Sequence, residues 1–387
     1  MHSTPLGLYI HFPWCIKKCP YCDFNSHALK EGFKLSDQES RYIETLKQDL
    51  KNDLQLINTN NELQSIFLGG GTPSLFSGKS IRLLIDFIAD CFDFFPDIEI
   101  TLEANPGTLE HDSFEQYLNA GINRLSLGIQ SFNPQHLKKI GRIHTAGHSI
   151  KAIQDAKKSG FDNINLDIMF GLPNQNLTMS MEDCQQAIGF NTNHLSFYQL
   201  TLEPNTLFHN SPPAMPDEDL QFDMQQTIAD ELEKNGYERY EVSAYAKPDK
   251  QCRHNVNYWE FGDYLGIGAG AHSKLTFEGN IHRIWKQKNP KSYMQAVSYS
   301  APYRNVSEVP KDEILFESLL NSLRLKNGIE ISLLEFRTGM HIEKITQLLE
   351  QPLDQNLVTI SDTRLKCTDK GYLFIDEILQ SLLKFTD

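Results

Sequence analysis

Short apolar runs alternate with longer amphipathic stretches along the first 240 residues of the chain. The runs contain many β-branched and aromatic residues and recur roughly every thirty residues, which is the length of a βα unit. They cover residues 8–12, 65–70, 99–105, 124–130, 164–171 and 194–200. This repeat predicts an α/β fold whose parallel strands form a closed or nearly closed barrel.

The stretches between the runs carry apolar residues at helical spacing. The clearest ones span residues 39–57, 79–92, 145–160 and 219–236. Two of them end in Gly160 and Gly236, and glycine is favoured just after a helix because it adopts a positive φ without strain. Each strand is therefore expected to be followed by a helix that covers the sheet.

The pattern changes after about residue 302. We expect a barrel at residues 1–240, a barrel extension at 241–305 and a small winged-helix-like α+β domain at 306–387, with a hairpin around Asp362. Winged helices often bind DNA, but from Lys311 onward the chain has nine Lys and Arg against thirteen Asp and Glu. This acidic excess favours packing or protein contacts over nucleic acid.

Overall charge and hydropathy narrow the classes of function. The 387 residues include 50 acidic and 36 basic ones, and the formal charge of -14 disfavours a broad nucleic-acid surface. With 40% hydrophobic residues, the chain can bury a large core. It has no apolar run of about 18 residues, and its start, MHSTPLGLYI, lacks the features of a signal peptide. We expect a soluble, cytoplasmic protein without an integral membrane segment.

Polar, sulfur-containing or glycine residues follow every one of the six runs. In a parallel barrel, the loops after the strands build the functional site. The residues at these exits are Cys15, Cys19, Cys22, Gly69, Gly70, Gly71, Thr72, Pro73, Glu103, Asn105, Gln130, Asp167, Tyr198 and Gln199. A purely structural barrel would not need them at six successive exits, so we expect a site there.

The segment HFPWCIKKCPYCDF places Cys15, Cys19 and Cys22 close together. A helix would bring them onto one face, but Pro20 would remove a backbone donor and clash with the carbonyl of Ile16. The segment is therefore expected to be a loop that gathers three thiols. The other four of the seven cysteines are scattered, which is unlike a disulfide framework.

Two kinds of metal centre suit three thiolates. A tetrahedral zinc site could add His11 or His27 as its fourth ligand. A cubane iron-sulfur cluster is normally bound by cysteine thiolates, and three of them would leave one iron free for an exogenous chelator. Lys17 and Lys18 would offset part of the negative charge of such a cluster.

The spacing Cys15-x3-Cys19-x2-Cys22 after a first strand, with GGGTP after a second, resembles the radical S-adenosylmethionine (SAM) superfamily. The resemblance implies a partial (β/α)6 barrel and a 4Fe-4S cluster bound by the three cysteines. It also implies that SAM chelates the open iron through its amino and carboxyl groups. An electron donor is a further implied partner if SAM is cleaved.

Nearly the whole chain resembles the oxygen-independent coproporphyrinogen III oxidase family, through LYIHFPWC, FLGGGTPS, EANP, RLSLGIQSF, IGRIH and NLDIMFGLP. The resemblance implies that SAM contacts Tyr9, Tyr21, Gly70, Gly71, Thr72, Glu103, Gln130, Arg142 and Asp167. These residue types suit the ligand, because carboxylates accept hydrogen bonds from a ribose or ammonium group and a guanidinium binds a carboxylate. The glycines let a ligand approach the backbone closely.

The chain departs from the oxidase pattern in two places. The oxidase has a further cysteine two residues after the third cluster ligand, where this chain has Phe24. The oxidase also has an N-terminal extension, whereas this chain begins seven residues before LYIHF. Both departures disfavour coproporphyrinogen decarboxylation and leave a resemblance to the HemW-type haem chaperones, which share the barrel and the CDF sequence.

The HemW-type resemblance extends to CRHNVNYW at residues 252–259, which we expect in a loop. Cys252 and His254 are the candidate haem ligands, because thiolate and imidazole commonly bind haem iron. His272 is a further candidate ligand. Tyr258 and Trp259 offer flat apolar faces to a porphyrin.

These features predict a haem chaperone that binds a 4Fe-4S cluster, SAM and haem and passes haem to acceptor proteins, either as a monomer or as a homodimer. Catalytic residues are not predicted. Two alternatives stay open. One is the coproporphyrinogen III oxidase, which decarboxylates propionate side chains by radical chemistry. The other is a non-catalytic zinc or interaction protein.

Overall fold

A single twelve-stranded sheet organises the computed structural model, which describes residues 5–30, 32, 35–55, 62–107 and 113–383. The strand order is β14-β13-β12-β11-β1-β4-β5-β6-β7-β8-β10-β9. The order is linear, and different strands stand at its two ends. The barrel is therefore partial.

Six parallel strands form the centre of this sheet. They are β1 (Leu6–Phe12), β4 (Leu63–Gly70), β5 (Phe94–Ala104), β6 (Arg124–Gln130), β7 (Asn163–Phe170) and β8 (His194–Gln199). Each predicted apolar run lies in one of them, and every neighbouring pair is parallel. The predicted α/β class and partial parallel barrel are thus confirmed.

Further strands extend the sheet on both sides. Beside β1 lie β11 (Asp263–Ile267), which is parallel to it, and then the antiparallel β12 (His272–Phe277), β13 (Asn280–Lys286) and β14 (Arg304–Glu308). Beside β8 lie the antiparallel β10 (Ala244–Ala246) and β9 (Glu238–Arg239). A separate ladder joins β2 (Trp14–Cys15) to β3 (His27–Ala28).

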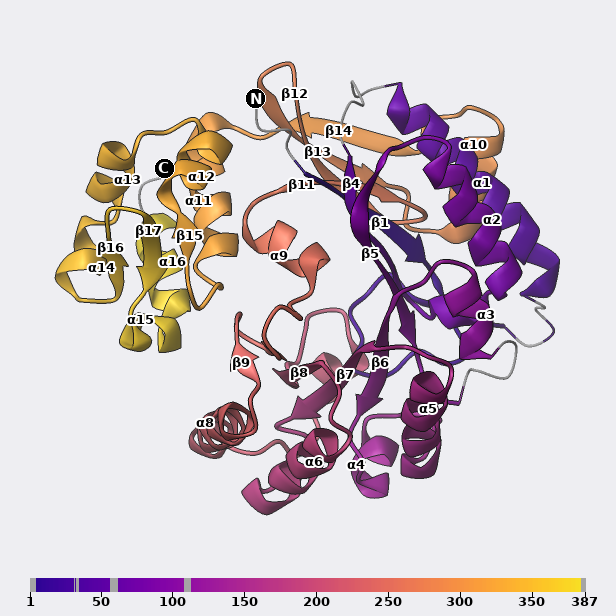
Figure 1. The fold of residues 1–387 in the computed structure, drawn as a ribbon, viewed down its shortest axis with the longest axis horizontal. Coiled ribbons are helices and arrows are strands. Elements are labelled where there is room, and N and C mark those ends of the chain that lie inside the picture. Colours follow the sequence, from indigo (N-terminus) through magenta and orange to yellow (C-terminus); the bar gives the residue numbers. More distant parts are fainter. Residues whose placement is uncertain (1–4, 31, 33–34, 56–61, 108–112, 384–387) are drawn as a thin grey trace.

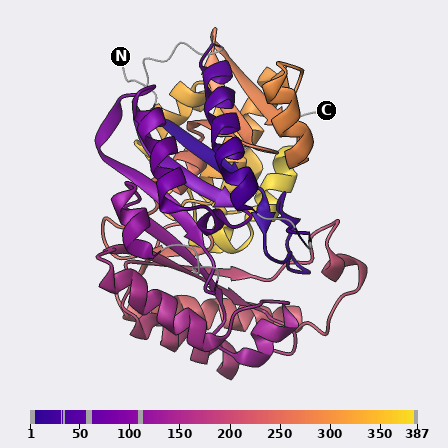
Figure 2. The same ribbon diagram turned by 90° about the vertical axis from the view of Figure 1, so that its right-hand side faces the viewer.

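Helices cover the outer face of the sheet, as Figure 1 shows, and in the view of Figure 2 they lie in front of the C-terminal helices. They are α1 (Ser36–Leu54), α2 (Gly78–Ala89), α3 (Phe114–Asn119), α4 (Pro134–Lys139), α5 (Ala146–Lys158), α6 (Leu177–Gly189), α8 (Glu218–Lys234) and α10 (Pro290–Ser298). The four predicted helical stretches correspond to α1, α2, α5 and α8, although residues 56 and 57 lie outside the described residues. Gly160 and Gly236 follow their helices with φ of 96° and 80°, as predicted.

The C-terminal part forms a small α+β unit with its own apolar core. It contains α11 (Lys311–Ser322), β15 (Ile329–Glu330), α12 (Ile331–Thr338), α13 (Ile342–Leu348), α14 (Glu350–Asp354), β16 (Val358–Ile360), β17 (Arg364–Cys367), α15 (Asp369–Leu373) and α16 (Ile375–Leu383). The β16–β17 hairpin turns at residues 361–363, where it was predicted. Between this unit and the sheet lies α9 (Arg253–Trp259) (Figure 1). The three domain boundaries stay a prediction.

Within the described residues, no helix combines the length and apolar character needed to cross a lipid bilayer.

A fully buried ion cluster joins α1 to the antiparallel strands. Lys286 on β13 lies 2.6 Å from a carboxylate oxygen of Asp49 and 2.6 Å from one of Asp53, and all three side chains are at most 1% exposed. Asp49 also accepts a hydrogen bond from the Gly268 N–H. The cation therefore offsets two carboxylates that water does not reach.

We predict that Lys286→Met lowers the free energy of unfolding by about 3–5 kcal/mol, because it leaves the buried Asp49 carboxylate without its cation and Asp53 with Arg304 alone. Urea unfolding followed by circular dichroism measures the loss. Lys151→Met is the matched control, since the Lys151 side chain is 73% exposed beside Asp155. Its effect should stay within about 0.5 kcal/mol, and equal effects of the two variants would contradict the prediction.

Candidate functional site

A cavity of about 460 Å³ opens at the carboxyl ends of the parallel strands. Its wall contains the three cysteines of the N-terminal loop and residues within or just after the C-terminal half of each of the six strands. Eight of the nine predicted SAM contacts line it: Tyr21, Gly70, Gly71, Thr72, Glu103, Gln130, Arg142 and Asp167. The volume falls within the range of roughly 300–1,000 Å³ that is usual for small-ligand sites.

The ninth predicted contact, Tyr9, does not line the cavity. Its hydroxyl lies 3.0 Å from Nδ1 of His11, and its ring stacks near Phe67 at a centroid distance of 6.4 Å. Tyr9 therefore contacts His11 and Phe67 rather than the cavity wall.

The cysteine loop presents three half-buried thiols to the cavity. Cys15 ends β2, which pairs with β3, and the Phe208 N–H donates to the carbonyl of Pro20 at 3.0 Å. Gly141 adopts a φ of 75° against the Pro20 ring, where a Cβ would approach to 2.6 Å. The loop is thus fixed at its base and at its tip, as the prediction of a thiol-gathering loop requires.

Each sulfur lies near a polar group. The Thr72 hydroxyl donates toward Cys15 at 3.6 Å, and Arg142 Nη1 donates toward Cys19 at 3.7 Å. Hydrogen bonds of this kind stabilise the thiolate form that binds metal.

Cys22 completes the set through Ser26, whose hydroxyl oxygen is 3.5 Å from the sulfur. The three thiols, each in contact with a polar group, therefore form a set of ligands that fits an iron-sulfur cluster.

The predicted alternative of a zinc site fits less well. His11 has both ring nitrogens engaged, by the Tyr9 hydroxyl and by the Asn25 carbonyl, and Nε2 of His27 lies 3.2 Å from Asn25 Oδ1. Among the described residues, no three His, Cys, Asp or Glu side chains are grouped closely enough to hold one ion. The three thiolates of a cubane cluster do not have to lie as close together, because each of them binds a different iron.

Two buried carboxyl groups face the cavity from neighbouring regions of the sheet. Glu103 accepts a hydrogen bond from the Gly70 N–H at 3.0 Å, and burial together with the nearby Asp167 raises the pKa of Glu103 to about 8. Burial also raises the pKa of Asp167, although its carboxylate accepts hydrogen bonds from Ser126 and Asn165. Such acceptors suit an ammonium group or ribose hydroxyls.

Arg142 makes its hydrogen bonds mainly to other groups of the protein. Nη2 donates to Asn105 Oδ1 at 2.5 Å and to the Gly128 carbonyl at 2.8 Å, while Asn105 in turn donates to Thr72. Together with its contact to Cys19, this makes Arg142 a bridge between the thiol loop and two strand ends. Asn105 was singled out in the sequence only by its position after a strand.

Gln130 is held in a strained backbone conformation at the cavity wall. Its φ is 68°, and the register of β6 with β7 shifts between Gly128 and Gln130. A non-glycine residue rarely adopts this conformation unless its surroundings fix it. Here the Tyr198 hydroxyl donates to Gln130 Oε1 at 2.5 Å, so the bulge turns the Gln130 amide toward the cavity.

The segment CRHNVNYW does not form a loop, and that prediction is wrong. Residues 253–259 are helix α9, packed inside the curve of the sheet. His254 is 2% exposed, with Nδ1 2.9 Å from the Ser65 hydroxyl and Nε2 3.1 Å from the Tyr258 hydroxyl. Both ring nitrogens therefore already have partners within the protein.

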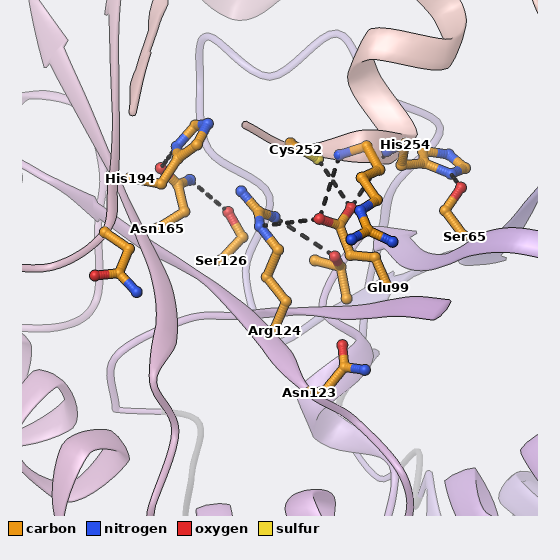
Figure 3. A network of polar contacts seen from close by, with 12 residues as sticks. Ser65, Glu99, Asn123, Arg124, Ser126, Asn165, His194, Cys252 and His254 are labelled. Carbon is orange, nitrogen blue, oxygen red and sulfur yellow. Dashed lines mark hydrogen bonds and ion pairs between the residues drawn. The ribbon is translucent and has the colours of Figure 1, made fainter. Parts of the chain in front are cut away.

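A carboxylate on β5 explains why α9 begins where it does (Figure 3). Glu99 accepts hydrogen bonds from the N–H groups of Arg253 and His254, each at 3.2 Å, and from the Cys252 thiol at 3.4 Å. It also lies 3.9 Å from Nε of the buried Arg124. Glu99 thus satisfies otherwise free donors at the first turn of α9.

The predicted haem ligands are not brought together. Cys252 is fully buried and His254 nearly so, whereas His272 is exposed on β12 opposite Trp285. None of the three lines the cavity. Their role as haem ligands stays a prediction, and for Cys252 and His254 it requires α9 to open.

The fold and cavity define the class of protein. The family model of the radical SAM superfamily matches residues 9–185, and that of the HemN C-terminal domain matches residues 309–374. Among solved structures, coproporphyrinogen III oxidase (HemN) from Escherichia coli, a radical SAM enzyme, superposes with a TM-score of 0.81. It is 24% identical and the match covers 98% of this chain and 90% of that one, so it supports the fold.

Closer relatives in sequence identify the family. The chain is 46% identical to the heme chaperone HemW of Haemophilus influenzae, over 98% of both chains. It is 44% identical to the heme chaperone HemW of Escherichia coli, again over 98% of both. The chain therefore belongs to the HemW family of radical SAM proteins, as its resemblance predicted.

The buried Glu103 carboxyl should make stability depend on pH. Because the folded state keeps a proton that the unfolded state loses above its ordinary pKa of 4.5, the free energy of unfolding should fall as pH rises toward about 8. Relative to Glu103→Gln, the fall should reach about 1.4 kcal/mol per pH unit.

Urea unfolding of the cluster-free protein between pH 5 and pH 8 measures this dependence. The exposed Glu115→Gln is the control and should follow the wild-type curve. Parallel curves for wild type and Glu103→Gln would show that Glu103 is ionised throughout.

Proposed function

We propose that this protein is a haem chaperone that binds a 4Fe-4S cluster and SAM in the strand-end cavity and delivers haem to acceptor proteins. The observation that carries the proposal is the near full-length identity of 46% and 44% to two proteins named heme chaperone HemW. The cavity supports the cluster and SAM parts independently, through its thiols and its buried carboxyls.

The cluster would be held by Cys15, Cys19 and Cys22. When bound, a 4Fe-4S cluster of this kind supplies an open iron that binds SAM and an electron that reduces SAM. The protein's own contribution is to fix the three sulfurs through the loop contacts and to donate hydrogen bonds toward two of them from Thr72 and Arg142.

SAM would lie between the cluster loop and the strand ends. Its amino group and ribose would meet Glu103 and Asp167, which have no cationic partner in hydrogen-bond contact among the described residues. The backbone of Gly70 and Gly71 would face its methionyl end. A Cβ on Gly71 would come within 2.5 Å of the Trp14 carbonyl, so only glycine fits beside the loop.

We predict that replacing Cys15, Cys19 or Cys22 by Ser lowers bound iron from about four per chain to below one after anaerobic reconstitution, because a cubane needs all three thiolates. Iron analysis and visible absorption measure the loss. The matched control is Cys91→Ser, since Cys91 is half-buried far along the chain and does not line the cavity. Undiminished iron in the three variants would refute the cluster assignment.

The chaperone role is tested on the same reconstituted protein. Haem added to it should give a Soret band that survives gel filtration, and the haem should pass to an apo-haemoprotein. Conversion of coproporphyrinogen III with stoichiometric methionine and 5′-deoxyadenosine, without retention of haem, would instead identify an oxidase.

A further inference from the structure

A second cavity, larger than the first, lies between the sheet and the C-terminal unit. Its volume is about 710 Å³, and its walls are the β12–β13 hairpin on one side and α11, α12, α13 and α16 on the other. Figure 1 shows α11 and α12 on the side of the C-terminal unit that faces the sheet. We call this cavity the interdomain groove.

The interdomain groove is largely apolar. Ile281 and Ile314 belong to one buried cluster at its base, and Phe316 and Met340 line its wall. Phe336 also lines it and is 58% exposed. An exposed aromatic side chain beside a deep apolar groove indicates a surface that binds a partner or ligand.

The charged residues of the groove are mostly basic. Lys311, Arg337 and Lys344 line it with a single acidic residue, Asp312, although the C-terminal segment as a whole has a net negative charge. Among the described residues, none of the three cations forms an ion pair within 4.0 Å. Their charge is therefore available to an anionic ligand.

Arg337 adds a buried unmet donor. Its Nε is inaccessible to water and has no hydrogen-bond partner in the described part of the chain. The carboxylates of Asp263 and Glu260 act electrostatically on Arg337, and Asp263 is bound at 2.7 Å by Lys274. Arg337 lines the groove and adds positive charge to its wall, although its buried Nε lies out of reach of a ligand there.

Size and chemistry select the occupant. The strand-end cavity is smaller, is lined by thiols and carboxyls, and in the proposed function already holds a cluster and SAM. The interdomain groove instead combines a long apolar wall with cations. A flat apolar molecule that carries two carboxylates at one edge matches this combination.

We propose that haem binds in the interdomain groove. This proposal rests on the proposed function of the protein as a haem chaperone. Its macrocycle packs against Phe336 and Ile281, and its propionates face Lys311, Arg337 and Lys344. The site differs from Cys252, His254 and His272, none of which lines the groove.

The test uses the full-length reconstituted protein and ferric haem. Phe336→Glu and Lys344→Glu each place a negative charge in the groove at an exposed side chain, and each should weaken haem binding at least tenfold in a Soret titration. Phe374→Glu and Lys366→Glu are matched controls, because both residues are exposed on the same unit outside the groove. They should change the affinity by less than twofold, and all four variants should retain the wild-type iron content and circular dichroism.

A second arm tests the propionate contacts directly. Wild-type protein should prefer haem to its dimethyl ester, and Lys344→Glu should remove that preference. If wild-type protein binds no haem at all, the proposed function fails. If it binds haem and the groove variants bind equally well, the function stands and the interdomain groove is excluded as the site.

Discussion

The interior of the open barrel is polar, and the cost of burying polar groups there governs how the rest of the chain is arranged. Arg124 on β6 and Glu99 on β5 are 2% and 6% exposed. An isolated charge in this position would be strongly destabilising. Glu99 is instead shared between the Arg124 guanidinium and the first turn of α9, so the helix that fills the inner face is oriented by a carboxylate of the sheet.

The cost of burying polar groups also distinguishes polar residues that bond only within the protein from those available to a ligand. Asn165 makes hydrogen bonds only to protein groups among the described residues: it donates to Ser126 and Asp167 and accepts from His194, whose other ring nitrogen meets the Tyr240 hydroxyl. Among the described residues, by contrast, Glu103 has a single hydrogen-bond donor, the Gly70 N–H, and its pKa is raised. A buried carboxyl with so little compensation is destabilising unless a ligand completes its surroundings, which is the behaviour of a binding site.

The sequence predicted the parts of the fold that follow from periodicity. The six parallel strands are long, apolar and evenly spaced, so their pattern identifies them without tertiary information. Strands β9, β10 and β12 to β14 escaped prediction because they are short or carry polar residues, such as Arg304 and Glu308, and gain their stability from pairing with neighbours. Propensity is a weak guide in such cases.

For the site, too, the features that follow from the strand pattern could be predicted, and those that depend on tertiary contacts could not. Residues at strand ends converge by topology alone, and eight of the nine expected SAM contacts accordingly line one cavity. The placement of His254 failed because its surroundings depend on Ser65 and Glu99, which are distant in sequence. The commitment of Arg142 to Asn105 and Gly128 was likewise invisible, since it depends on the turn that brings Arg142 back over β6.

The polar interior also sets the position of the C-terminal unit. Tyr240, whose hydroxyl bonds to His194 and to the Cys252 N–H, accepts at its carbonyl the N–H of Lys326 just beyond α11. Nearby, Arg324 pairs with Glu241 and lies over the Trp259 ring at 4.4 Å. The contacts that hold α9 and Tyr240 inside the barrel therefore also hold the unit that carries α11 and α12. In this way both walls of the interdomain groove are fixed to the barrel.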